Sequence, residues 1–345
     1  MAASGLDPST IFPFPLDDFQ LEAIDALDQG HSVVVSAPTG SGKTLVGEYA
    51  IHRALAHCQK VFYTTPLKAL SNQKLRDFRE AYGDDNVGLM TGDLSVNREA
   101  SIVVMTTEIF RNMLYAEASE HDDPLADVEA VVLDECHYMN DSQRGTVWEE
   151  SIIHCPPSVQ LVALSATVAN AGQLTDWIEK VHGPTTLVLS DYRPVPLQFS
   201  FCSAKGLHPL LNDAGTGLHP NCKVWRAPKG HKRKGRSAKP PQPEPPPISF
   251  VVAQMAERDM LPAIYFIFSR RGCDKAVRDL GIQCLVNKEE QARIRARFKA
   301  YSSDNPEAVR DGIHADALLR GIAAHHAGVL PAWKELIEEL FQQGL

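Results

Sequence analysis

Short runs of apolar, mostly β-branched residues alternate with helical stretches between about residues 17 and 190, and this alternation limits the possible folds most strongly. The runs are residues 31–36, 60–65, 101–106, 130–134, 160–165 and 185–189. Their nearly continuous apolar character is typical of parallel strands that are covered on both faces. The helical stretches between them include 43–56, 67–81 and 107–116. The alternation therefore predicts βαβ units and an open parallel α/β sheet.

The α/β pattern is interrupted at residues 203–249 and resumes after Phe250. The interruption has no periodicity, and it holds eight lysines and arginines but no acid between Asp213 and Glu244. It fits a solvated linker with an extended proline-rich end, and it also fits a basic arm that contacts nucleic-acid phosphates. After the interruption we expect a buried strand at 263–268 and helices at 270–280, 288–301, 306–322 and 332–343.

Length and composition exclude several classes of protein. The 345 residues are enough for about two domains, and 44% hydrophobic with 22% charged residues is the profile of a globular chain. A net charge of −9 argues against a wholly basic nucleic-acid coat protein but leaves room for a local basic groove. The seven cysteines include no CxxC pair, which predicts reduced thiols and a cytoplasmic location. Neither a signal peptide nor a membrane-spanning run is expected.

A glycine-rich segment follows the first predicted strand. Residues 37–44 stand between a strand and a helix, which is the setting that a P-loop requires. We expect their backbone N–H groups to surround the β-phosphate of ATP, Lys43 to neutralise the β/γ-phosphate charge, and the Thr44 hydroxyl to bind Mg²⁺. The predicted phosphate-binding residues are Ala37, Pro38, Thr39, Gly40, Ser41, Gly42, Lys43 and Thr44.

An acidic pair follows the apolar strand at 130–134. Ligands of open α/β sheets bind at the carboxyl ends of the strands, which places Asp134 beside the P-loop. Asp134 is expected to hold Mg²⁺, and Glu135 to orient and polarise the water that attacks the γ-phosphate. Cys136 is predicted to be a packed thiol. His137 has two interpretations, a structural histidine and a residue that couples the nucleotide site to a nucleic-acid site.

With these motifs in this order, the chain resembles the DExH-box helicases of superfamily two, and most of all the superkiller and exosome-associated RNA helicases. The resemblance implies tandem RecA-like domains, ATP and Mg²⁺ as cofactors, RNA as the substrate and RNA-decay machinery as a partner class. The stretch from His137 to Glu150 is similar to these RNA helicases and usually differs in DNA-repair relatives, which favours RNA. The implied organisation is an N-terminal segment at 1–16, an ATP-binding domain at 17–202, the insertion at 203–249 and a partial second domain at 250–345.

The resemblance also implies roles for single residues. Gln20 would read adenine, and the catalytic set would be Lys43, Asp134, Glu135 and His137. Backbone contacts to the nucleic acid would come from Pro66, Lys68, Thr91, Gly92, Thr106, Thr107, Arg270 and His325. Ser165, Ala166 and Thr167 would couple the two sites. The alternative for these hydroxyls is a role in a turn or a helix cap. This alternative is favoured for Thr106 and for Thr167 when each is considered alone. Trp148 is predicted to pack in the core.

The family pattern continues with a coupling strand and a motif that ends in paired arginines, and neither occurs before Leu345. The 96 residues from 250 to 345 are short for a complete second domain of this kind. Arginine fingers contribute on the order of 10³–10⁵ to phosphoryl-transfer rates. Three interpretations therefore stay open: an ATP-dependent RNA helicase, a fragment that binds ATP and nucleic acid without unwinding, and a DNA helicase.

Overall fold

The chain forms two compact units, Met1–Pro196 and Leu197–Leu345, in a computed structural model. The structure describes residues 6–115, 124–222, 245–304 and 312–345. The division between the units falls at residue 196, whereas the sequence placed the end of its ATP-binding domain at residue 202. Each unit has hydrophobic clusters of its own.

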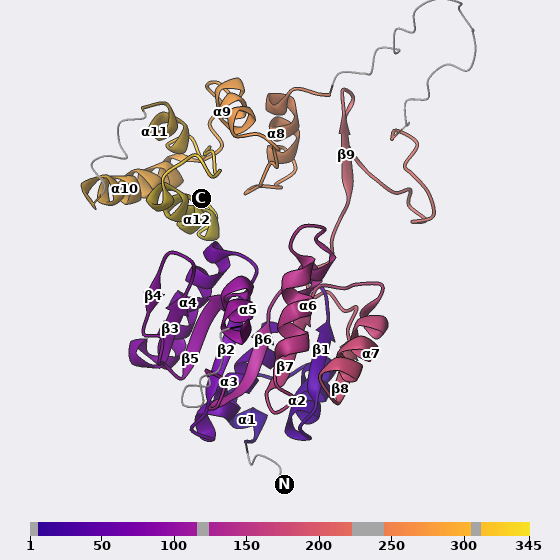
Figure 1. The fold of residues 1–345 in the computed structure, drawn as a ribbon. Coiled ribbons are helices and arrows are strands. Elements are labelled where there is room, and N and C mark those ends of the chain that lie inside the picture. The colour runs from indigo at the N-terminus through magenta and orange to yellow at the C-terminus, as the bar shows by residue number, and fades with distance from the viewer. Residues whose placement is uncertain (1–5, 116–123, 223–244, 305–311) are drawn as a thin grey trace, which may run out of the picture. The chain divides into compact units, whose positions relative to one another are not determined.

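An eight-stranded sheet forms the centre of the first unit (Figure 1). Its strand order is β4-β3-β5-β2-β6-β7-β1-β8, and every neighbouring pair is parallel except β3 with β4. The strands are β1 Ser32–Ser36, β2 Lys60–Thr65, β3 Val87–Met90, β4 Ser95–Val96, β5 Ile102–Thr106, β6 Val128–Leu133, β7 Gln160–Ser165 and β8 Thr185–Leu189. All the strands predicted in this region are confirmed. The short strands β3 and β4, at the β4 end of the sheet, were not predicted.

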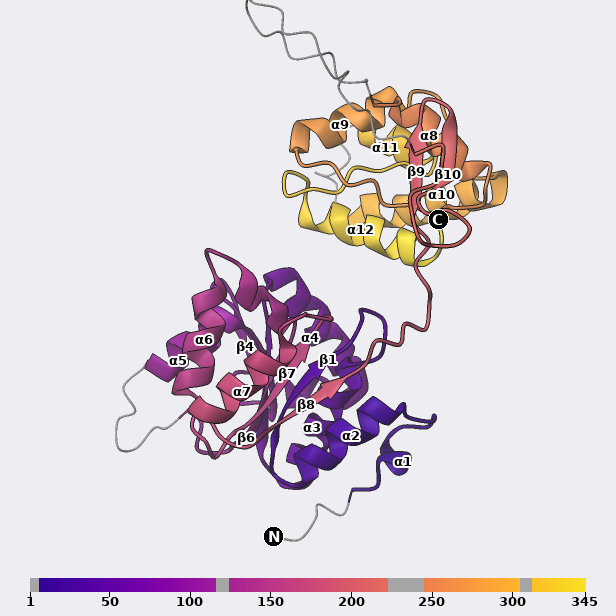
Figure 2. The ribbon, with the colours of Figure 1, turned by 90° about the vertical axis from the view of Figure 1, so that its right-hand side faces the viewer.

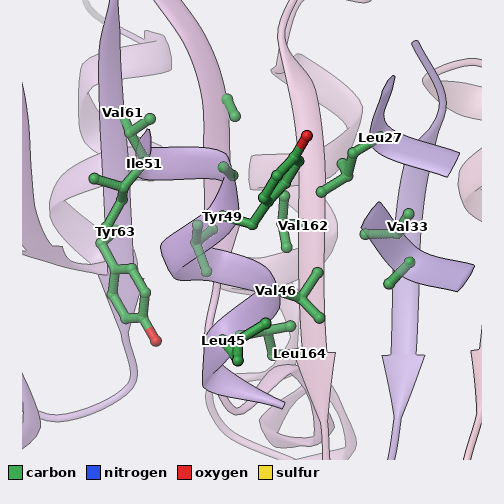
Figure 3. Packing of buried hydrophobic residues seen from close by; sticks show 14 of the residues in the cluster. Leu27, Val33, Leu45, Val46, Tyr49, Ile51, Val61, Tyr63, Val162 and Leu164 are labelled. Atoms are coloured by element: carbon green, nitrogen blue, oxygen red, sulfur yellow. The ribbon is translucent and has the colours of Figure 1, made fainter. Parts of the chain in front are cut away.

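Helices cover both faces of this sheet, because alternate residues of each strand point to opposite faces. Val33 and Val35 of β1 pack in one cluster with residues of α2, α3 and α4, whereas Val34 packs in a second cluster with residues of α5, α6 and α7. Figure 2 shows these two helical layers. In the first cluster Tyr49 lies beside Val162 (Figure 3). The two layers make this unit a RecA-like α/β fold.

The helices of the first unit agree with the predicted stretches at 43–56, 67–81 and 107–116. They are α1 Pro8–Ile11, α2 Asp18–Asp28, α3 Thr44–Ala56, α4 Lys68–Tyr82, α5 Thr107–Tyr115, α6 Gly145–His154 and α7 Ala171–Val181, with the short 3₁₀ helices η1 Asp84–Asn86 and η2 Cys136–Asn140. The helices α4 and α5 begin within three residues of the ends of β2 and β5, and α3 begins at Thr44, after the loop of residues 37–43 that follows β1. Their N-termini therefore stand at the carboxyl edge of the sheet.

A buried arginine on α3, Arg53, contacts the amino ends of β6 and β7. The side chain of Arg53 is 3% exposed, and its Nε donates to Oε1 of Glu129 on β6 at 2.6 Å. Its guanidinium also donates to the carbonyl of Leu27 at 2.5 Å and to the side chain of Gln160 on β7. A buried cation is tolerated only with such partners. Arg53 therefore fixes α2, α3 and the two central strands to one another.

The second unit is largely helical. It begins with an antiparallel hairpin of β9 Ser200–Ser203 and β10 Gly206–Pro209. Its helices are α8 Ile248–Ala256, α9 Arg270–Asp279, α10 Lys288–Asp304, α11 Gly312–Leu318 and α12 Pro331–Gln342. Helices were predicted close to the positions of α9, α10 and α12, and α11 forms within the predicted stretch 306–322. The eight basic residues of the predicted linker lie outside the described residues, so its two interpretations stay open.

The predicted buried strand at 263–268 is wrong. These residues form no strand, and the side chains of Ile264, Phe266 and Phe268 are 64%, 81% and 104% exposed. An apolar run becomes a buried strand only where a neighbour supplies ladder hydrogen bonds and cover. In the described part of this unit, the strands β9 and β10 pair with each other and not with 263–268. The second unit therefore shows no parallel sheet among the residues that the structure describes.

The seven cysteines, all within the described residues, are free thiols. Across the described ranges, no helix combines the length and apolar character needed to cross a bilayer.

We expect Arg53→Ala to lower the free energy of unfolding of the first unit by about 3 kcal/mol, because it leaves Glu129, whose side chain is 11% exposed, without its buried guanidinium partner. Urea unfolding followed by hydrogen exchange of β6 and β7 would measure this loss in the first unit alone. Arg98→Ala is the control, since that side chain is 67% exposed and lies 3.8 Å from an equally exposed Glu99. It should change stability by less than about 0.5 kcal/mol. Equal effects of the two variants would contradict the role given to Arg53.

Candidate functional site

The loop between β1 and α3 has the backbone conformation of a phosphate-binding cradle. Gly40 and Gly42 adopt φ values of 83° and 84°, which residues with a Cβ rarely adopt. The helix α3 begins at Thr44 immediately after the loop. The first turn of a helix offers backbone N–H groups that no helical carbonyl accepts, and its dipole favours an anion there.

Two polar side chains of this loop are buried without a partner. Lys43 is 6% exposed and Ser41 is 4% exposed. Within the described residues, Lys43 forms no ion pair and Ser41 Oγ has no hydrogen-bond partner. A buried ammonium and a buried hydroxyl are costly unless a ligand completes their contacts. The loop therefore fits an anionic ligand with several acceptor oxygens, which is the chemistry of a nucleotide polyphosphate.

Gln20 of α2 is placed beside this loop, with both ends of its amide already engaged. Its Nε2 donates to the carbonyl of Gly42 at 3.1 Å, and its Oε1 accepts from the N–H of Asp17 at 2.9 Å. A Cβ on Gly42 would lie 2.9 Å from this Nε2. Gln20 is 5% exposed. The structure thus shows Gln20 fixing the phosphate-binding loop, and its predicted reading of adenine stays a prediction.

The carboxylate of Asp134 is held from two sides at the end of β6. Its Oδ2 accepts from the Tyr63 hydroxyl at 2.8 Å, and its Oδ1 accepts from the backbone N–H of Glu135 at 2.9 Å. Burial and the charge of Asp134 hold the pKa of Tyr63 well above its ordinary value, so the phenol stays protonated and donates. Asp134 is 8% exposed. Its orientation is therefore set by β2, the strand that carries Tyr63.

The side chains of Glu135 and His137 are in contact, and His137 also contacts the segment that follows β7. Glu135 has a φ of 53° and a ψ of 43°, a left-handed conformation that is unfavourable for a residue with a Cβ. His137 Nδ1 lies 3.3 Å from Glu135 Oε2 and 3.4 Å from the backbone N of Ala166. A protonated Nδ1 donates to the carboxylate, whereas an unprotonated one accepts from the N–H of Ala166. The two contacts therefore cannot form at the same time, because one needs a proton on Nδ1 and the other needs Nδ1 without a proton.

The segment 165–167 connects this acidic segment to the P-loop. The N–H of Ala37 donates to the carbonyl of Ser165 at 3.2 Å. The hydroxyls of Ser36 and Ser165 donate to the carbonyl of Ala166 at 3.4 Å and 2.9 Å. Thr167 is exposed. Ser165 and Ala166 thus stand between the two motifs, whereas Thr167 takes no part in these bonds.

Thr44 and Asp134 are the residues of this site that could hold Mg²⁺. Within the described residues, no cluster of three or more histidine, cysteine, aspartate or glutamate side chains could hold a metal by itself. Mg²⁺ commonly keeps several waters and takes one or two carboxylates together with substrate phosphates. One buried carboxylate with a hydroxyl beside a phosphate cradle fits that mode of binding.

The predicted nucleic-acid residues of the first unit gather at the same edge of the sheet. Lys68, at the start of α4, forms an ion pair with Asp93. A Cβ on Gly92 would lie 3.7 Å from Lys68 Nζ, so the loop of residues 91–93 packs against this lysine. Thr91 closes that loop by donating its N–H to the carbonyl of Leu94 at 2.8 Å. The Lys68 and Asp93 side chains are 52% and 78% exposed, which leaves this pair open to solvent.

Thr106 and Thr107, which were predicted to contact the nucleic acid, are buried in the fold. Thr107 is fully buried, and its hydroxyl donates to the carbonyl of Thr65 at 3.3 Å. Thr106 is the last residue of β5 and is 6% exposed. The side chain of Thr107 therefore joins the end of β2, next to Pro66, to the start of α5.

Tyr63 and Arg144 are two residues of the site that were not predicted from the sequence. Tyr63 is a tyrosine in an apolar strand, which nothing in the sequence distinguishes from core. Arg144 belongs to the stretch from His137 to Glu150, but its contacts to Pro66 and Glu108 come from segments far away in the sequence.

The predictions that Cys136 is a packed thiol and that Trp148 lies in the core are confirmed. Cys136 is fully buried, and burial raises the pKa of its thiol to about 12, as expected for a packed thiol. Trp148 is fully buried in the cluster under α6.

In the second unit, Arg270 opens α9 close to the segment 325–328. The Arg270 Cδ would lie 3.5 Å from a Cβ on Gly328. His325 Nε2 lies 2.8 Å from Glu338 Oε1, and His326 Nε2 lies 3.0 Å from Asp274 Oδ1. The structure thus brings Arg270 and the histidine segment together within this unit.

Comparison with known proteins agrees with this geometry. A family model described as DEAD/DEAH box helicase matches residues 17–174. The chain is 45% identical to the DExH-box ATP-dependent RNA helicase DExH15 chloroplastic of Arabidopsis thaliana, over 97% of this chain and 32% of the relative. It is 44% identical to the probable helicase HelY of Mycobacterium tuberculosis strain H37Rv, over 96% of this chain and 38% of that protein.

A further relative is the exosome RNA helicase MTR4 of Homo sapiens, which is 41% identical over 97% of this chain and 33% of its own length. The chain therefore spans about a third of the length of the curated relatives that it matches. The predicted resemblance to the DExH-box helicases is confirmed. The chain contains a DEAD/DEAH box helicase domain, and its homologues are the DExH-box RNA helicases, the MTR4 helicases and HelY.

Proposed function

We propose that this chain binds and hydrolyses ATP and couples hydrolysis to movement along RNA or to its unwinding. One observation carries the proposal: a continuous set of contacts runs from the P-loop through Ser165 and Ala166 to His137. Asp134 lies in the same segment as His137 and is bonded to Tyr63 of β2. The end of β2 leads into Pro66, a residue predicted to contact the nucleic acid. A change at the γ-phosphate would thereby move groups at the nucleic-acid edge.

The chemical roles follow from the positions of the side chains. Lys43 and the N–H groups at the start of α3 bind the phosphates, and Thr44 and Asp134 would hold Mg²⁺. When bound there, the metal would neutralise charge on the phosphates. Glu135 orients the attacking water and polarises it. Glu135 follows β6 directly in the αL conformation, and its carboxylate lies 3.3 Å from His137 Nδ1.

RNA is the proposed substrate. The named RNA helicases among the relatives support it, and so does the stretch from His137 to Glu150. The partners proposed from the resemblance are components of RNA-decay machinery, and a cytoplasmic location remains a proposal that rests on the seven free thiols.

A second candidate function is binding of ATP and nucleic acid without unwinding. The observation that favours it is the second unit, in which the described residues form no parallel sheet and 263–268 stays unpaired. ATP turnover that responds to RNA would argue against it.

We expect Lys43→Ala to abolish ATP binding, because it removes the only cation that the described loop offers to the phosphates. Glu135→Gln should keep ATP binding and lower the hydrolysis rate by at least 10²-fold, since an amide is a poor base for the attacking water. Binding of a fluorescent ATP analogue and single-turnover hydrolysis would measure the two effects. Lys43→Ala that binds ATP as tightly as wild type would contradict the assigned nucleotide site.

We expect Tyr63→Phe to raise the Mg²⁺ concentration needed for half-maximal ATP binding by about tenfold, because Asp134 loses one of its two charge-assisted hydrogen bonds. Titration of Mg²⁺ at fixed ATP would measure the shift, and ATP binding without Mg²⁺ should stay the same. Tyr82→Phe is the matched control, since its ring packs on Phe78 in the same cluster. A Mg²⁺ requirement unchanged by Tyr63→Phe would contradict this account of Asp134.

We expect RNA to stimulate ATP turnover more than DNA of the same sequence at one fixed salt concentration. The salt must be fixed because contacts to the phosphate backbone weaken steeply with ionic strength. Stronger stimulation by DNA would favour a DNA helicase, and no stimulation by either would favour the second candidate function.

A further inference from the structure

Arg144 joins three segments that the sequence separates. Its Nε donates to Glu108 Oε1 at 3.0 Å, and its Nη2 donates to the carbonyl of Pro66 at 2.6 Å and also contacts Glu108. Its guanidinium carbon lies 5.8 Å from the centre of the Trp148 ring. Pro66 follows β2, Glu108 lies in the first turn of α5, and Arg144 precedes α6. One guanidinium therefore holds the starts of two helices and a loop in one arrangement.

The loop that presents Arg144 is itself fixed. The carboxylate of Asp141 accepts from the N–H groups of Gln143 and Arg144, each at 2.9 Å, and its carbonyl accepts from Gly145 at 2.8 Å. These backbone N–H groups hold the pKa of Asp141 below its ordinary value. A Cβ on Gly145 would lie 2.2 Å from the carbonyl oxygen of Met139, so this position accepts only glycine without a backbone shift. The loop follows directly on η2 and thus on the segment 134–137.

We propose that Arg144 is a positioning residue that fixes the nucleic-acid edge of the first unit relative to its nucleotide site. This inference rests on the proposed function. It assigns to Arg144 the relative placement of the α4 and α5 N-termini, whose N–H groups and dipoles would hold backbone phosphates. Because Arg144 lies ten residues after Asp134, a shift of the acidic segment reaches Pro66 and Glu108 through one short loop.

A different role for Arg144 is direct contact with a phosphate. Its side chain is 34% exposed, and the contacts above use Nε and Nη2. The two roles predict opposite results at Glu108. If Glu108 positions the guanidinium, its removal weakens nucleic-acid binding. If Arg144 binds phosphate, removal of a competing carboxylate strengthens that binding.

The first experiment measures the RNA concentration that gives half-maximal stimulation of ATP turnover, on the full chain. We expect Arg144→Ala to raise it by about tenfold, as the loss of charged hydrogen bonds implies. Arg144→Lys should raise it similarly, because one ammonium cannot reach both Pro66 and Glu108 in the forked geometry. Glu108→Gln should raise it by a smaller factor. ATP binding without RNA is measured alongside, so that damage to the nucleotide site registers separately.

Arg111→Ala is the matched control, because Arg111 lies on α5 with Glu108 and pairs with Glu150 of α6 at 3.4 Å. It should shift the RNA concentration by less than about twofold. A wild-type value for Arg144→Lys, together with tighter RNA binding by Glu108→Gln, would overturn the positioning role in favour of a phosphate contact.

A second measurement does not depend on the proposed function. Arg144→Ala should speed amide hydrogen exchange in the first turns of α4 and α5, at residues 71–73 and 111–113, with little change in β6 and β7. Unchanged exchange at those residues would overturn the inference even if RNA stimulates the enzyme. Faster exchange there in a protein that RNA does not stimulate would retain the placement and overturn the proposed function.

Discussion

Parallel strands end at the same edge of a sheet, and the candidate site depends on this constraint. The order β1, β7, β6, β2 places the P-loop, the segment 165–167, Asp134 and Pro66 in a row along that edge. Neighbouring strands lie about 4.8 Å apart, so the row extends over roughly 14 Å. Side chains of moderate length can bridge each step. The His137 side chain bridges one step at Ala166, the Tyr63 hydroxyl bridges another at Asp134, and a backbone bond from Ala37 to Ser165 closes the first step.

In this row, His137 can form either of two alternative contacts. Its Nδ1 faces both Glu135 and the N–H of Ala166 at nearly equal distances, and one nitrogen cannot donate to the first while it accepts from the second. With a proton on Nδ1, the ring is bonded to the residue that is proposed to orient water. Without that proton, it is bonded to the segment that touches the P-loop. These alternative contacts are compatible with both interpretations of His137, the coupling role and the structural one.

The sequence predicted those parts of the fold that local pattern controls. The central strands are apolar along their whole length, and a buried parallel strand requires this character whatever its partners are. The strands β3 and β4 are short and lie among polar and turn-forming residues, so no pattern marks them. Residues 263–268 show the reverse: they carry the pattern of a strand, yet the structure supplies no neighbour with which they pair.

The same distinction applies to the site. The glycines of residues 40–42 and the pair Asp134–Glu135 have a fixed spacing within one short segment, so a motif identifies them. The second amide contact of Gln20, the hydroxyl of Tyr63 and the fork of Arg144 act over 22, 71 and up to 78 residues of chain. Such contacts depend on the strand order, which has to be known before they can be inferred.

The two cations at the proposed nucleic-acid edge, Lys68 and Arg144, differ in how firmly they are held, and this difference suits the proposed function. An exposed pair such as Lys68–Asp93 is worth less than about 1 kcal/mol, so a phosphate can replace the carboxylate at little cost. Arg144 is bonded to a backbone carbonyl as well as to a carboxylate and lies over an aromatic ring, so its displacement would break several contacts at once. The edge therefore combines a cation that can exchange partners with one that cannot. Under the proposed function, the first would suit release of RNA in each cycle, and the second would keep the helix N-termini in place during that release.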